Sequence, residues 1–138
     1  MTVHQAALVS CAIVTLLVPA VCKAEIEGTK AAGILGQEIC IVDNSYTAAD
    51  FRDAYERRVR AKGYTTRLVQ EKTACPVTTT FVATYGKTGW GRYLQTAMFT
   101  VWRDGEEIAV VRYRGSRHTP FKGKVEDVIG EMVAVLFP

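Results

Sequence analysis

The dipeptide Asp104-Gly105 separates two runs of alternating side chains and constrains the fold of this chain more than any other feature. Asp-Gly is a strong signal for a two-residue hairpin turn, so the sequence predicts antiparallel strands over 92–103 and 106–114. Pairing Arg103 with Glu106 fixes the register, and side chains alternate between the two faces. One face is then expected to be core, with Ala97, Phe99, Val101, Ile108 and Val110. The other face is expected to carry Met98, Trp102, Val111 and Tyr113.

Apolar periodicity predicts three further strands and two helices. The strands are expected over 38–43, 65–70 and 77–85, and amphipathic helices over 48–62 and 124–137. Thr47 and Asp50 have the spacing of a capping box at the first helix. The predicted order is β-α-β-β-β-β-α, which fits an α+β two-layer sandwich, a mainly antiparallel sheet of about five strands with both helices on one face. Residues 38–138 are expected to form a single domain.

The amino terminus has the layout of a secretory signal peptide over residues 1–24. Residues 6–20 are an almost unbroken apolar run, and Cys22-Lys23-Ala24 is an A-x-A-like site with cleavage expected after Ala24. The run is shorter than the roughly 20 residues of a spanning helix, so no transmembrane segment is expected after cleavage. The mature protein is therefore expected in the periplasm or outside the cell. The alternative is a lipoprotein anchored at Cys22, although Val21 is large for a lipobox. Residues 25–37 are interpreted as a flexible arm.

Cleavage would leave two cysteines in the mature chain, Cys40 and Cys75. An even pair in an exported protein indicates a disulfide, and two buried free thiols are the alternative. The whole chain has 17 basic residues, one of them Lys23 of the signal, against 14 acidic residues. This near balance gives no reason to expect a nucleic-acid partner.

The sequence predicts no catalytic residue, metal site or cofactor. Only His118 remains as a histidine after cleavage, so a common Cys/His zinc site cannot be assembled. A hydrolase using Ser116 and His118 stays as an alternative, but no nucleophile turn surrounds Ser116. The remaining acidic candidates have ordinary explanations as cap, helix surface and hairpin rim; they are Asp43, Asp50, Asp53, Glu106 and Glu107.

The predicted binding residues lie on the sheet face without helices and in the turn over 86–91. An exposed apolar patch with a nearby loop aromatic is typical of a partner site. The apolar and aromatic candidates are Trp90, Tyr93, Met98, Trp102, Val111 and Tyr113. The alternatives are coverage of this face by Ile34 and Leu35, or dimerisation through it. A basic segment over 112–124 could bind lipid or glycan; its cations are Arg112, Arg114, Arg117, Lys122 and Lys124.

Several short motifs resemble a group of small uncharacterised envelope proteins and lipoproteins of Gram-negative bacteria. They are Tyr85-x4-Trp90-x2-Tyr93-Leu94, the hairpin with Gly105, Arg112-Tyr113, and a final helix ending in Leu136-Phe137. The resemblance implies a compact exported α/β domain and supplies no catalytic residue.

The resulting hypothesis is a non-enzymatic exported protein that binds another envelope protein, or a second copy in a homodimer, through the sheet face and the Trp90 loop. One variant of it is an immunity or inhibitor protein. The alternatives are a small periplasmic hydrolase and a lipid- or glycan-binding module that uses residues 112–124.

The signal-peptide prediction is tested by the intact mass of the protein after expression in a Gram-negative host. We expect a product that begins at Glu25 and is lighter than its reduced form by two hydrogen atoms, because one disulfide has formed. A diacyl- or triacyl-modified product beginning at Cys22 would contradict this and indicate a lipoprotein.

Overall fold

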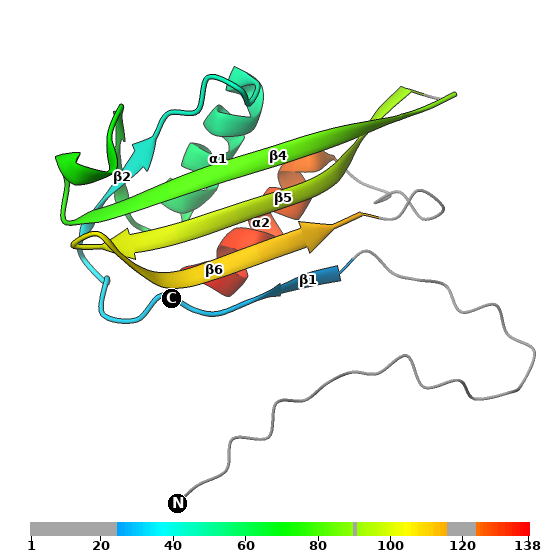
Figure 1. Cartoon of the computed structure of the whole chain (residues 1–138). Helices are drawn as coiled ribbons and strands as arrows, with labels where there is room; N and C mark the ends of the chain where they lie inside the picture. Colours follow the sequence, from blue (N-terminus) through cyan, green and yellow to red (C-terminus); the bar gives the residue numbers. More distant parts are fainter. Residues whose placement is uncertain (1–24, 90, 116–123) are drawn as a thin grey trace, which may run out of the picture.

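The computed structural model describes residues 25–89, 91–115 and 124–138, which form six strands, two α-helices and one short 3₁₀ helix. The elements of the first half are β1 (Glu25–Gly28), β2 (Glu38–Val42), α1 (Ala49–Ala61), β3 (Thr65–Val69) and the 3₁₀ helix η1 (Lys72–Ala74). Those of the second half are β4 (Val77–Thr88), β5 (Gly91–Arg103), β6 (Glu106–Arg114) and α2 (Val125–Leu136), as Figure 1 shows.

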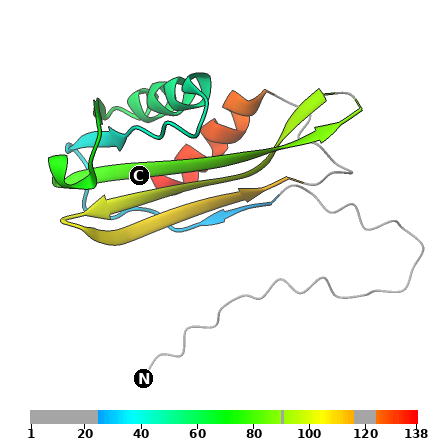
Figure 2. The ribbon, with the colours of Figure 1, turned by 45° about the horizontal axis from the view of Figure 1, so that its top comes forward.

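The strands form one mixed sheet in the order β1-β6-β5-β4-β2-β3. Strand β6 pairs antiparallel with both β1 and β5, and β5 pairs antiparallel with β4. Strand β2 runs parallel to both β4 and β3. Both helices lie on one face of this sheet (Figures 1 and 2). The predicted α+β class is therefore confirmed, and the sheet has one strand more than expected. No helix among the described residues is long and apolar enough to cross a membrane.

The additional strand, Glu25–Gly28, lies in residues 25–37, the segment that the sequence suggests is a flexible arm. Glu25–Gly28 pairs with β6, and the following chain donates a 2.8 Å hydrogen bond from Ala31 N to Leu136 O. Ala31 and Ile34 are fully buried in the core on the helix side, so Ile34 does not cover the opposite face. The sequence of this segment shows no alternation of apolar and polar residues that would indicate a strand. Its conformation depends instead on tertiary contacts with the edge of β6 and with α2.

Helix α1 packs on the sheet through an aromatic cluster. The Tyr55 ring stacks on Phe99 with ring centroids 4.0 Å apart, and Phe51 lies 6.1 Å from Phe81. The buried Tyr55 hydroxyl is 2.6 Å from Thr79 Oγ1, which in turn donates to the carbonyl of Thr100 at 2.9 Å. The expected apolar stripe of this helix is therefore its buried face.

The capping box expected at Thr47 does not form. The helix is preceded by Ala48, which makes no side-chain cap, and Asp50 Oδ1 accepts a hydrogen bond from Phe51 N instead. Thr47 belongs to the preceding turn, where its N–H donates to Asn44 O at 3.1 Å. Asn44 holds this turn on the sheet through a 3.0 Å hydrogen bond from Nδ2 to Phe81 O.

The predicted disulfide between Cys40 and Cys75 is present. Cys40 is fully buried on β2, and it pairs in register with Thr78 of β4 on the face away from the helices. The bond holds residues 70–76, which we call the strap, against that face.

Removing the disulfide should lower the free energy of unfolding by about 3–4 kcal/mol, because a 35-residue separation is no longer closed in the unfolded chain. The test compares urea unfolding of the wild type with that of a Cys40→Ala/Cys75→Ala variant. The reduced wild type is the control, because it separates loss of the bond from loss of packing at the buried Cys40 site. Equal midpoints for all three would contradict the expectation.

Burial raises the pKa of Tyr55 above its ordinary value of 10.0. The unfolded chain therefore loses the Tyr55 proton first, so the stabilisation is complete below pH 10 and falls as the pH rises further. We expect a loss of up to about 1.4 kcal/mol per pH unit from this group. In denaturation series from pH 8 to pH 11, the stability gap between the wild type and Tyr55→Phe should be constant below pH 10 and should narrow above it.

Candidate binding face

A β-bulge in the hairpin of β5 and β6 decides which side chains lie on the face without helices, here called the open face. Arg103 pairs with Glu106 and Trp102 with Glu107, as expected, but Val101 then pairs with Ala109, so Ile108 is an extra residue. An extra residue exchanges the faces of everything that follows it on the strand. Val111 and Tyr113 are therefore in the core, with exposed fractions of 0% and 2%. Their expected place on the open face is wrong.

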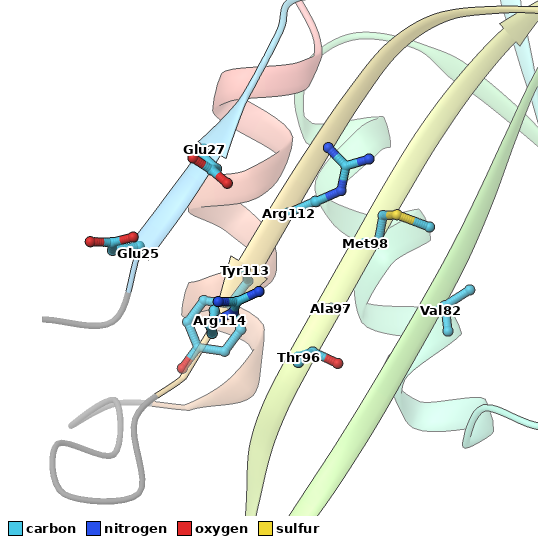
Figure 3. A pocket seen from close by; sticks show the side chains of 9 residues that line it. All are labelled: Glu25, Glu27, Val82, Thr96, Ala97, Met98, Arg112, Tyr113 and Arg114. Atoms are coloured by element: carbon cyan, nitrogen blue, oxygen red, sulfur yellow. The ribbon is translucent and has the colours of Figure 1, made fainter. Parts of the chain in front are cut away.

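The same bulge brings Arg112 and Arg114 onto the open face, where they join Met98, as Figure 3 shows. Across four strands, Glu27, Arg112, Met98 and Val82 lie side by side in register. The next row consists of Glu25, Arg114, Thr96 and Thr84.

These rows surround a shallow depression of about 330 Å³. We call the side chains that face it the open region; they are Glu25, Glu27, Val82, Thr96, Met98, Arg112 and Arg114. The buried Ala97 and Tyr113 also line it, at the base between these side chains.

The charges of the open region are not neutralised by one another. Glu25 pairs in register with Arg114, and Glu27 with Arg112. Among the described residues, however, neither guanidinium has a carboxylate within the 4.0 Å of an ion pair. Two cationic groups therefore lie beside the apolar side chains of Met98 and Val82 and, like them, are available for contacts with a partner.

The other end of the open face is covered by the strap. Lys72 Nζ lies 4.0 Å from the centroid of the Trp102 ring, a cation–π contact, and Trp102 Nε1 donates to Thr80 Oγ1 at 3.1 Å. Thr78 and Thr100 are buried there. Trp102 does lie on the open face, as expected, but the strap reduces its access to a partner.

The hairpin between β4 and β5 is longer than the sequence indicates. Residues 86–88 and 91 are strand rather than turn. Tyr93 is partly buried, and its ring fills the space in which Gly86 would need a Cβ, so a side chain at Gly86 would displace it. Trp90, Arg117 and Lys122 lie outside the described residues, as do Ser116 and His118.

The described residues offer one group of three candidate metal ligands, Glu38, Cys40 and Cys75. Both sulfur atoms of this group are used by the disulfide, and Glu38 pairs with Arg67 at 3.1 Å. Of the acidic candidates, Asp53 and Asp43 lie 3.0 and 3.3 Å from Arg52, and their hydrogen bonds raise the pKa of that guanidinium. Asp43, Asp53 and Glu38 are therefore held in ion pairs with arginines, and the two cysteines in the disulfide.

Sequence reasoning missed a second depression, of about 340 Å³, on the helix side. It lies between the first turns of α1 and α2 and the β4–β5 hairpin, where Arg92 stacks on Tyr85 at 4.8 Å. Burial raises the pKa of Tyr85. No local sequence pattern could have indicated it, because its walls come from three elements far apart in the chain.

Comparisons with known proteins locate the fold but no family. No protein-family model and no curated protein matches the chain. Among solved structures, the chain is similar to a dodecamer of a PelC variant from Paraburkholderia phytofirmans, with a TM-score of 0.59 and 11% sequence identity. The match covers 80% of this chain and 95% of that chain. At this identity the similarity concerns the fold alone.

Proposed function

We propose that this chain is a non-enzymatic exported protein that binds a protein partner, either another envelope protein or a second copy of itself, through the open region. The observation that carries the proposal is the composition of that region. Two arginines of β6 without an ion pair among the described residues lie on one side of Met98 and Val82, on a sheet face that the helices leave bare. Arginine and methionine are enriched at protein interfaces, and a polar rim around an apolar centre is their usual anatomy.

Export is supported by two independent features. The first is the apolar amino terminus with its A-x-A-like site. The second is the Cys40–Cys75 disulfide, since such bonds form and persist mainly in oxidising compartments.

A second copy as the partner is supported by the structural comparison. The similar PelC protein is a dodecamer, so a chain with this arrangement of elements can assemble with copies of itself. Assemblies of this kind bury a surface patch on every subunit. The open region is the patch that this chain offers.

The proposal is tested by site-specific photo-crosslinking in living cells. A photoreactive amino acid is placed at Val82, in the open region, where the side chain is 45% exposed. The matched control is Leu68, which is 41% exposed but points to the helix side, because it pairs in register with the core residue Ile41. Products are identified by mass spectrometry.

We expect crosslinks from Val82 to a defined envelope protein or to a second copy, and none from Leu68. A variant Met98→Asp should abolish the Val82 product, because a carboxylate replaces the apolar centre of the site. Equal products from both positions, or none from Val82, would contradict a binding role for the open region.

A further inference from the structure

The outer surface of helix α2 carries a narrow acidic stripe. Asp127, Glu131 and Ala134 are exposed at positions i, i+4 and i+7, which places them in one row on the side away from the sheet. Asp127 has one ionic contact, at 3.6 Å from Arg58, whereas Glu131 has no ion-pair partner among the described residues. The row therefore presents two carboxylates followed by a small side chain.

The spacing of this stripe matches the arginines of the open region. Asp127 and Glu131 are four residues apart on a helix, which is about 6 Å along its axis. Arg112 and Arg114 are two residues apart on a strand, which is about 7 Å. Two cations and two anions with nearly equal spacing can form two ion pairs at once.

The directions of the two elements also agree. Helix α2 packs against β6, β1 and β5; it starts behind the strands at the end of the sheet where β6 finishes and crosses them obliquely toward the other end (Figure 1). Asp127 is therefore at the same end as Arg114, and Glu131 at the same end as Arg112. A copy stacked with its bare sheet face on the helix layer of another lays its strands, β6 among them, against α2, which is the arrangement in which these groups can be opposed.

We infer that the partner of the open region is a second copy of this chain, bound head to tail, with the α2 stripe of one subunit on Arg112 and Arg114 of the next. The inference rests on the proposed function, because it names the occupant of the same site. It is distinct from a two-fold dimer. A two-fold axis along β6 would oppose the arginines of one copy to those of the other, which is repulsive.

A head-to-tail contact has a consequence for assembly size. A head-to-tail pair still offers a free open region at one end and a free α2 stripe at the other. Such a contact adds subunits until a ring closes, or continues as a filament. The wild type is therefore expected to form species larger than a dimer.

The test uses charge reversal on the two surfaces of the mature, oxidised protein. One variant is Arg112→Glu/Arg114→Glu. The other is Asp127→Asn/Glu131→Arg, in which the amide keeps an oxygen for the Asp127 contact with Lys124 N. The control is Lys62→Glu at the C-cap of α1, an exposed cation outside both surfaces. Circular dichroism checks folding, and sedimentation velocity measures size.

We expect the wild type and Lys62→Glu to form the same large species, which dissociate when ionic strength rises from about 0.05 M to about 0.5 M. Each charge-reversed variant alone should associate at least roughly tenfold more weakly. An equimolar mixture of the two should form heterodimers that neither variant forms alone, because the unchanged α2 stripe of one variant meets the unchanged arginines of the other.

Three results would overturn the inference. These are a wild type that is monomeric at every concentration, a variant with Asp127→Asn/Glu131→Arg that still self-associates, and a mixture that stays monomeric. The proposed function fails separately. It would survive a monomeric wild type if Val82 still crosslinks to another envelope protein, and it would be lost if Val82 gives no product.

Discussion

Both helices pack on the same face of the six-stranded sheet, and the rest of this structure depends on that arrangement. The covered face takes the aromatic cluster of Phe51, Tyr55, Phe81 and Phe99, together with the apolar side of α2. The bare face is partly covered by the strap and otherwise carries mostly polar side chains. The strap closes over Cys40, Thr78 and part of Trp102, while the strands farther from it carry threonines and paired rows of opposite charge. What remains accessible is the open region with its two arginines.

One extra residue in β6 determines the chemistry of that patch. With regular pairing, Val111 and Tyr113 would face solvent, and Arg112 and Arg114 would point into the core, where two unpaired guanidiniums would be costly. The bulge at Ile108 turns both arginines to the bare face and buries the ring of Tyr113 in the core. The same displacement that completes the hydrophobic core thus supplies the cations of the open region, so the core and the charges of the bare face depend on a single backbone irregularity.

The sequence predicted features that depend on local chemistry. The Asp104-Gly105 turn, in which both residues have positive φ, the stripes of the two helices and the cysteine pair are each encoded within a short stretch or a simple count. It did not predict β1, because Glu25–Gly28 is held by the edge of β6, or the strap, whose place depends on the disulfide. One feature of the sequence did indicate the bulge. The regular register paired Arg112 with Ala97 on the supposed core face, whereas the alternation of Val111 and Tyr113 with Arg112 and Arg114 favoured the opposite assignment.

The position of the disulfide bears on how fast the chain reaches this structure. β4, β5 and β6 are joined by tight hairpins, so each strand meets a neighbour in sequence, but β2 must find β4 across the whole of α1 and β3. Pairings of that kind slow folding, because the loop must be closed before any contact rewards it. A bond between Cys40 and Cys75, 35 residues apart, holds that loop closed once it has formed. Keeping this loop closed therefore depends on oxidation, and a chain kept reduced is expected to spend longer with its strand edges exposed to other chains.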